Sequence, residues 1–187
     1  MDTNEFWSYI QTANTQSNED MDEKCKVIET IISKMSVENA KQFRNHFTAF
    51  MEKSYSWELW GAAYFIWGGC SDDNFNDFRA SLISRGKEKY NKAVSNPDTL
   101  ALENYDEDTW FYEGFDYAVY ETTENIIGKD EIALVAKNEP SGSEWQEEQS
   151  FFENTYPELW KKYGHEWDFS KAHIQVLSSP KPWWKFW

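Results

Sequence analysis

The sequence predicts an all-α protein: a single compact multi-helix domain with a buried central helix and a short extended C-terminal tail. Apolar residues recur three and four positions apart along most of the chain, the spacing of one face of a helix. The stretch WELWGAAYFIW (57–67) is apolar nearly all round, so we expect it to be the central helix. Only 5 Pro and 8 Gly interrupt the 187 residues. We expect the helical domain over residues 1–177 and the tail over residues 178–187.

The composition is that of a folded globular protein, with 40% hydrophobic and 27% charged residues. Cys25 and Cys70 lie far apart and outside any CxxC pattern, which excludes a disulfide scaffold and a cysteine zinc site. The first residues lack the basic segment followed by an apolar segment that is typical of a signal peptide. No stretch reaches the ~20 apolar residues that a membrane span needs. We therefore expect a cytoplasmic protein with no transmembrane segment, no metal and no cofactor.

Three helices are expected before residue 55. Asp2 or Thr3 can cap the first, with Glu5 at capping-box spacing from Asp2, and Ser36 can cap the third. Each helix has an apolar stripe that predicts its buried face. These stripes are Phe6, Trp7 and Ile10 in the first helix, Val27, Ile28, Ile31, Ile32 and Met35 in the second, and Ala40, Phe43, Phe47, Phe50 and Met51 in the third.

The central helix is expected to end at Gly68-Gly69, because glycine accepts the left-handed conformation of a helix C-cap. Ser71 can cap the next helix, and a further short helix is expected after Gly86, to about residue 94. The buried stripe after Ser71 comprises Phe75, Phe78 and Leu82.

A long helix is expected from about Asp108 to Ile127, with Gly128 ending it. Before it, Asn96-Pro97-Asp98 restarts the chain, and Pro97 suits a first helical position. The inner face of the long helix is expected to comprise Trp110, Phe111, Phe115, Ala118, Val119 and Thr122.

The remaining segments are less regular. Residues 132–136 fit a strand and a last helical turn equally well, and residues 138–149 are expected to form a loop. Thr155 and Glu158 have capping-box spacing before a short helix that is expected to end at Gly164.

Acidic residues concentrate in one segment of the chain. Residues 98–153 hold 16 acidic and 2 basic residues, which accounts for nearly all of the formal net charge of −15. Such a surface repels nucleic acid and anionic membranes, and it steers basic proteins toward itself. We therefore expect a basic protein partner and no nucleic acid. Solubility alone is an equally good explanation of a single acidic face.

The densest polar group of residues follows the central helix. Ser71, Asp72 and Asp73 precede Asp77 and Arg79 by one to two helical turns. Adjacent carboxylates can share a cation or raise one pKa for acid–base chemistry. A structural role is favoured: Ser71 caps the helix, the carboxylates meet its positive end, and Arg79 pairs with one of them.

Two further groups of residues suit an interface. Tyr112, Glu113, Asp116 and Tyr120 are expected to share the outer face of the long helix, where aromatic residues beside carboxylates act as anchors. The tail SSPKPWWKFW has two prolines that disfavour a helix, and dense aromatic residues that are costly to leave in water. Its anchors are Trp183, Trp184, Phe186 and Trp187.

The tail is interpreted as an extended recognition segment. Lys181 and Lys185 would let it rest on the acidic surface when no partner is bound. A weak contact with a membrane surface is the competing interpretation, because Trp and Lys favour lipid headgroups.

The block from Trp57 to Gly86, together with NEFWSYI (4–10) and SNPDTLA (95–101), resembles a bacterial family of proteins, domain of unknown function number 4240, over about residues 4–125. The resemblance implies no activity and no catalytic residue. The tail lies outside it and loosely resembles tails of small bacterial proteins that include toxin-immunity families. The matching positions are Trp57, Leu59, Trp60, Gly61, Ala62, Ala63, Gly68, Gly69, Cys70, Ser71, Asp72, Asp73, Phe75, Phe78, Arg79, Gly86 and Pro97.

The function we expect is that of a non-enzymatic acidic interaction protein, an immunity or antitoxin-like inhibitor of a basic partner. The alternative is a small-ligand-binding protein or an enzyme. Its pocket would be formed by Trp57, Trp60, Ser71, Asp72, Asp73 and Arg79.

Overall fold

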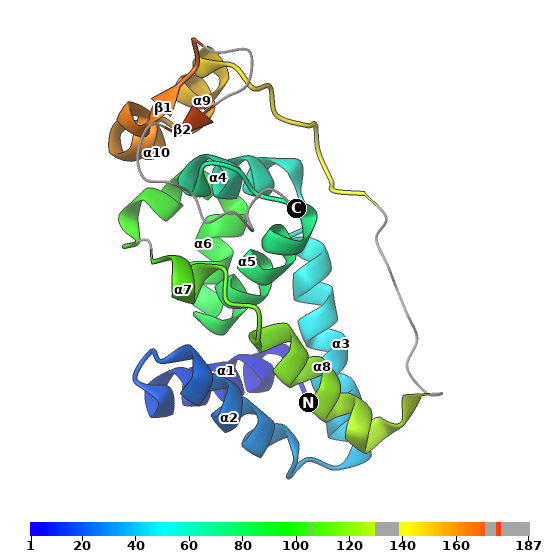
Figure 1. Cartoon of the computed structure of the whole chain (residues 1–187). Coiled ribbons are helices and arrows are strands. Elements are labelled where there is room, and N and C mark those ends of the chain that lie inside the picture. The colour runs from blue at the N-terminus through cyan, green and yellow to red at the C-terminus, as the bar shows by residue number, and fades with distance from the viewer. Residues whose placement is uncertain (105, 130–138, 171–174, 177–187) are drawn as a thin grey trace.

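The computed structural model describes residues 1–104, 106–129, 139–170 and 175–176, and it confirms the all-α prediction. Ten α-helices are formed by the described residues (Figure 1). They are α1 (Thr3–Ser17), α2 (Met21–Ile32), α3 (Val37–Lys53), α4 (Trp57–Trp67), α5 (Asp72–Ser84), α6 (Lys87–Ser95), α7 (Glu107–Trp110), α8 (Phe115–Ile127), α9 (Gln149–Thr155) and α10 (Pro157–Tyr163). Short elements complete the order: the 3-10 helices η1 (Pro97–Leu102) and η3 (Gly164–Glu166) and the strands β1 (Trp167–Asp168) and β2 (Gln175–Val176), which pair antiparallel.

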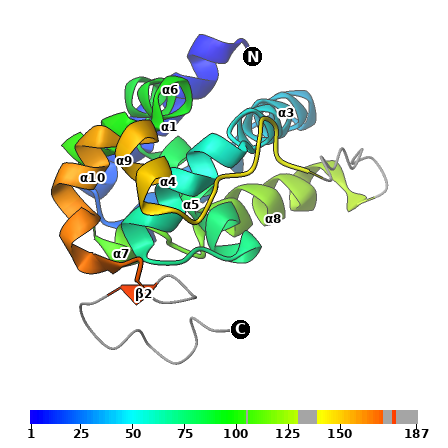
Figure 2. The same cartoon turned by 90° about the horizontal axis from the view of Figure 1, so that it is seen from above.

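The helices are arranged in three groups along the molecule. At one end α1 packs on α2, and α8 packs against both α2 and α3 (Figure 1). Helices α4, α5 and α6 form the middle, and at the other end α10 packs on α4, α9 and η1 (Figures 1 and 2). Among the described residues, none of the helices combines the length and the hydrophobicity that a membrane-spanning segment requires.

A side-chain cap determines where each of the first five helices begins. Asp2 and Ser36 accept hydrogen bonds from main-chain N–H groups of α1 and α3, and Ser71 does the same for α5, as the sequence predicts. The α2 and α4 helices have such caps too, in Asp20 and Ser56. Because each cap satisfies an N–H group that has no partner within its helix, local sequence determines these starts.

Helix α4 is the core of the fold, as predicted, and Gly68 ends it with a φ of 73°. Phe65 is fully buried and stacks on Trp167 with a centroid distance of 5.3 Å. The Trp167 indole also donates a hydrogen bond to the Phe65 carbonyl at 3.0 Å. The face of α4 that carries Trp57 and Trp60 is only half-buried.

The predicted helix over 108–127 is wrong, because the structure divides it into α7 and α8. Phe111 leaves the helical path to pack against Trp67, with a centroid distance of 3.8 Å. The Tyr112 N–H group donates to the Ser81 hydroxyl at 3.3 Å. Gly114 permits the turn, since a Cβ atom there would lie 2.4 Å from the Tyr112 ring.

The predicted capping box of the last helix is also wrong. Pro157 takes the first position of α10, and the N–H groups of Glu158 and Leu159 donate to the Asp98 carboxylate at 2.9–3.1 Å. Asp98 lies on η1, about 60 residues earlier in the chain. The cap therefore comes from tertiary structure and ties the last helices to the middle of the molecule.

Residues 139–148 form no helix and run along the outside of the molecule toward α9 (Figure 1). Ser141 exchanges main-chain hydrogen bonds of 2.9 Å with Tyr55 and Trp57, and Trp145 packs on Trp57 and Tyr64. This agrees with the predicted loop. The predictions for residues 132–136 and for the tail 178–187 lie outside the described residues.

Candidate functional site

The predicted pocket contains a stack of aromatic rings. Trp57 stacks on Trp60, and Trp60 stacks on Phe75, at centroid distances of 5.2 and 4.9 Å. The Trp60 indole donates a hydrogen bond of 3.0 Å to the Cys70 carbonyl. The polar edge of Trp60 therefore has a main-chain partner, and this part of the predicted pocket is filled by side chains.

The polar members of the predicted pocket do not converge. Ser71 caps α5, Asp72 accepts from the Tyr55 hydroxyl at 3.2 Å, and both remain exposed, as does Asp73. Arg79 is buried and donates to the Met51 carbonyl at 2.8 Å.

The predicted ion pair between Arg79 and Asp72 or Asp73 is therefore wrong. The Arg79 guanidinium lies 4.5 Å from the centre of the Tyr55 ring, where it points into the core. The two carboxylates stay in solvent, since the first turn of α5 faces outward.

Catalytic groups are not brought together in the described residues. His46 is half-buried beside the Met1 carbonyl, His165 is exposed, and His173 lies outside the described residues. Burial raises the pKa of the Cys25 thiol to about 11 and also raises the pKa of Cys70, which makes both poor nucleophiles. No group of three or more His, Cys, Asp or Glu side chains among the described residues could hold a metal ion.

The predicted outer face does not form either. Asp116 is buried and accepts from the Asn76 amide at 2.8 Å, and Tyr120 is half-buried against Phe47. Tyr112 precedes α8 and donates its hydroxyl proton to Asp22 at 2.6 Å. The break between α7 and α8 explains the difference, because Tyr112 and Glu113 do not continue the helix that carries Asp116 and Tyr120.

A different acidic group occupies this region, and we call it the acidic patch: Asp73, Asp77, Glu113, Asp116 and Tyr117. Tyr117 is 53% exposed, and the four carboxylates all raise its pKa. They come from α5, from the turn before α8 and from α8 itself. The patch thus combines one exposed aromatic ring with clustered negative charge.

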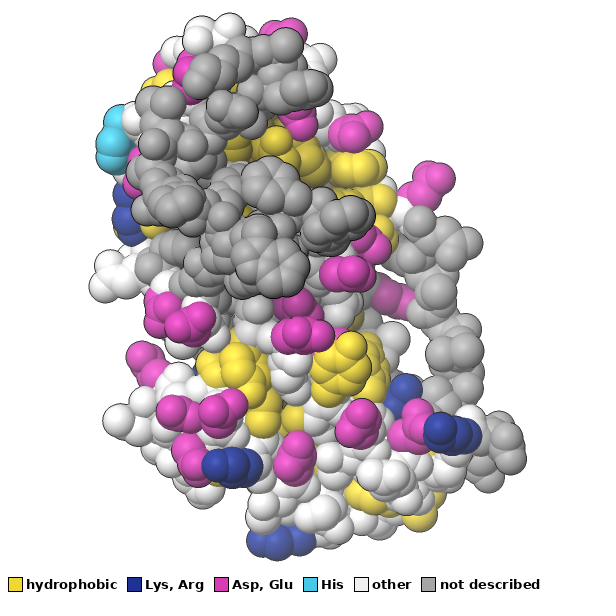
Figure 3. Space-filling view, in the orientation of Figure 1, with side chains coloured by type: hydrophobic (Ala, Val, Ile, Leu, Met, Phe, Trp, Pro, Cys, Tyr) yellow, Lys and Arg dark blue, Asp and Glu magenta, His cyan; other side chains and the backbone are white. Residues whose placement is uncertain are grey.

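Asp77 is the most perturbed carboxyl of the acidic patch. Burial raises its pKa to about 7, and the charges of Asp116, Glu113 and Asp73 raise it in the same direction. A carboxyl in this state is half protonated at neutral pH, so a cation placed beside it would restore its charge. Acidic side chains also outnumber basic ones over the face shown in Figure 3.

A family model described as protein of unknown function (DUF4240) matches residues 1–125. The chain belongs to this family. No curated protein and no solved structure matches the chain. All five residues of the acidic patch lie within the DUF4240 part, whereas α9 and α10 follow it.

Sequence reasoning missed Asp77 and Tyr117 as members of a site in this DUF4240 protein. Asp73 and Asp77 are four residues apart on a helix, a spacing that places them on one face. This spacing is the feature of the sequence that predicts two neighbouring carboxylates at this position. The approach of Glu113 and Asp116 depends on how α8 packs on α5, which no local pattern encodes.

Proposed function

We propose that this DUF4240 protein is a non-enzymatic interaction protein that binds a basic partner through the acidic patch. The observation that carries the proposal is that the charges of four carboxylates from separate segments all act on the exposed ring of Tyr117 and raise its pKa. Exposed tyrosine is favoured at interfaces, because a rigid ring offers a large contact area at low entropic cost.

Electrostatics supports the same conclusion. Burial raises the pKa of the Asp77 carboxyl to about 7, and repulsion by Asp116, Glu113 and Asp73 raises it in the same direction, so Asp77 retains a proton near neutral pH. Lysine or arginine side chains of a partner would relieve this repulsion. The net charge of −15 would also speed the encounter with such a partner at low ionic strength.

The finer form of the proposal is an immunity or antitoxin-like inhibitor that covers a basic surface of a toxin. The support is the same charge and the same aromatic anchor, because an inhibitor of this kind needs a complementary surface and no catalytic group. The alternative pocket around Trp57 and Trp60 has less support, since Ser71, Asp73 and Arg79 point in different directions.

The proposal is tested by titrating the full chain with a lysine- and arginine-rich peptide. We expect the double variant Asp73→Asn, Glu113→Gln to bind at least ten times more weakly than the native protein. Binding by the native protein should weaken as salt rises.

The matched control is Glu29→Gln, Asp108→Asn, which removes the same charge from exposed positions outside the acidic patch. Equal weakening by both double variants would show that net charge alone attracts the peptide, and it would sink the proposed site. For the finer form, the product of the neighbouring gene is the partner to co-express and to test with the same variants.

A further inference from the structure

A polar cavity of about 280 Å³ lies where α6 begins, and it shares no residue with the acidic patch. It is lined by residues of α1, α2 and α6 and by residues of the turns that precede α2 and α6. Its charged lining residues are Lys24, Arg85, Lys87 and Lys89 on the positive side and Glu19 and Glu88 on the negative side. The cavity is therefore cationic within a protein whose net charge is −15.

Lys24 is the residue of this cavity whose charge has the least compensation from the protein. It is only 2% exposed, yet among the described residues it has no hydrogen-bond or ion-pair partner. Burial lowers the pKa of its ammonium to about 8, and the charges of Arg85 and Lys89 lower it in the same direction. Glu19 and Cys25 act in the opposite direction without forming a hydrogen bond with it. Because Lys24 lines the cavity and is otherwise covered by the protein, its ammonium is placed to bind an anion there.

The start of α6 supplies further donors beside Lys24. Gly86 is the N-cap, with a φ of 98°, and none of the described side chains caps the helix there. The first intrahelical hydrogen bond runs from the Tyr90 N–H group to the Gly86 carbonyl. The N–H groups of Lys87, Glu88 and Lys89, residues that line the cavity, therefore have no partner within the helix, and the helix dipole favours negative charge at this end.

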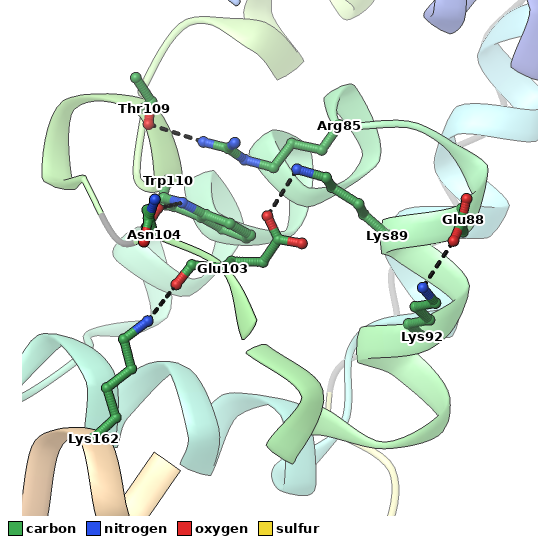
Figure 4. A network of polar contacts seen from close by, with 9 residues as sticks. All are labelled: Arg85, Glu88, Lys89, Lys92, Glu103, Asn104, Thr109, Trp110 and Lys162. Atoms are coloured by element: carbon green, nitrogen blue, oxygen red, sulfur yellow. Dashed lines mark hydrogen bonds and ion pairs between the residues drawn. The ribbon is translucent and has the colours of Figure 1, made fainter. Parts of the chain in front are cut away.

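Arg85 and Lys89 are held in place by a separate network (Figure 4). Arg85 donates to the Thr109 hydroxyl at 2.8 Å and lies 3.9 Å from the centre of the Trp110 ring. Its Nε atom is buried and finds no hydrogen-bond partner in the part of the chain that the structure describes. Lys89 pairs with Glu103 at 2.7 Å. Their own partners thus hold Arg85 and Lys89 near Lys24, and neither supplies the negative charge that Lys24 lacks.

We propose that this cavity is a binding site for a phosphate group, with Lys24 and the N-terminal N–H groups of α6 as its main ligands. Phosphate suits the site because its oxygens accept from an ammonium and from several N–H groups at once. The amides of Gln11 and Asn14 line the same cavity and can hydrogen-bond the hydroxyl groups of a small phosphate monoester. The phosphate is either free or carried by such a molecule.

Calorimetric titration with inorganic phosphate and with glycerol 3-phosphate tests the site, with sodium chloride at equal ionic strength as the reference. We expect specific binding of at least one of the two. Tighter binding of glycerol 3-phosphate identifies a monoester as the ligand, and equal binding identifies free phosphate. Absence of binding by both would overturn the proposal.

The variant Lys24→Met should weaken phosphate binding at least tenfold. Its matched control is Lys26→Met on the same helix, which loses the same charge from an exposed position and should bind as the native protein does. Equal affinity of Lys24→Met and the native protein would contradict the proposal.

Two further readouts separate a ligand-binding Lys24 from a merely structural one. Without phosphate, Lys24→Met should melt at a higher temperature than the native protein, because it removes an unpaired buried charge. The variant Glu19→Gln should bind phosphate more tightly, because it removes a nearby negative charge. If Lys24 and Glu19 instead form a structural pair, both variants will melt at lower temperatures and neither will improve phosphate binding.

Discussion

Buried tyrosine and tryptophan side chains in this protein direct their polar atoms to main-chain carbonyls. The Tyr90 hydroxyl donates to the Phe50 carbonyl and the Tyr156 hydroxyl to the Glu58 carbonyl, both at 2.7 Å. The Trp110 and Trp167 indoles likewise donate to main-chain carbonyls, so these four large rings are buried without leaving their donors unpaired. The backbone must approach these rings closely, which makes glycine positions critical.

Gly61 is one such position, and Gly61→Ala should destabilise the protein by about 1–3 kcal/mol. The new Cβ atom would lie 2.7 Å from the Tyr156 hydroxyl oxygen and displace it from the Glu58 carbonyl. Urea unfolding of Gly61→Ala, Tyr156→Phe and the double variant measures the coupling. Additive losses would show that the hydroxyl does not mediate the effect.

Asp77 predicts a pH dependence of stability that can be measured by thermal unfolding. Its folded pKa of about 7 lies above the ordinary value of 3.8 for an aspartate, so the stability it contributes is lost as pH rises from about 4 through 7. Asp77→Asn should therefore match the native protein near pH 4. It should exceed the native protein by about 1–2 kcal/mol above pH 7, after allowance for solvent screening. A gain that is independent of pH would contradict this origin.

At the scale of elements, local signals predicted what local contacts determine. The starts of α1, α3 and α5 follow from Asp2, Ser36 and Ser71, and the end of α4 follows from Gly68. The boundaries of these helices are therefore visible in the sequence.

Tertiary contacts explain what the sequence did not show. The break before α8 depends on Phe111 reaching Trp67, and the direction of Arg79 depends on Tyr55 lying above it. The polar residues of the predicted pocket do not converge for the same reason: Ser71, Asp72 and Asp73 lie close to Arg79 in the chain, but they face solvent while Arg79 faces the core. The polar cavity at the start of α6 could not be predicted from the sequence, because Lys24 lies on α2 and Arg85 lies after α5, about 60 residues later in the chain.

Asp98 allows a test of one such tertiary contact. Asp98→Ala should lower the free energy of unfolding by about 1–2 kcal/mol, because the N–H groups of Glu158 and Leu159 lose their acceptor. Asp98→Asn keeps one side-chain oxygen and should lose less. Chemical denaturation monitored by circular dichroism distinguishes the two, and an unchanged midpoint for Asp98→Ala would show that the cap does not stabilise the fold.

For the whole molecule, the DUF4240 match ends at residue 125, but the packed structure continues beyond it. Phe152 and Trp167 both stack on Phe65, with centroid distances of 4.9 and 5.3 Å, so residues after the match cover the central helix. The last helices are therefore part of the same folded body as α4.

Two truncations test this arrangement. Removal of residues 149–187 should lower the melting temperature steeply or prevent folding, because it exposes Phe65 and its neighbours to water. Removal of the tail 180–187, which the sequence predicts to be an extended recognition segment, should leave the melting temperature almost unchanged and reduce partner binding. Unfolding after the shorter deletion would show that the tail belongs to the core.

The central claim is that the acidic patch binds cations of a basic partner, and proton release measures it most directly. Near pH 7 the Asp77 carboxyl is half protonated, and a bound lysine or arginine lowers its pKa and expels the proton. Titration of the basic peptide at pH 7, in two buffers with different ionisation enthalpies, should therefore give different binding enthalpies for the native protein. The variant Asp77→Asn should give a much smaller difference. Equal enthalpies in both buffers for the native protein would contradict the claim.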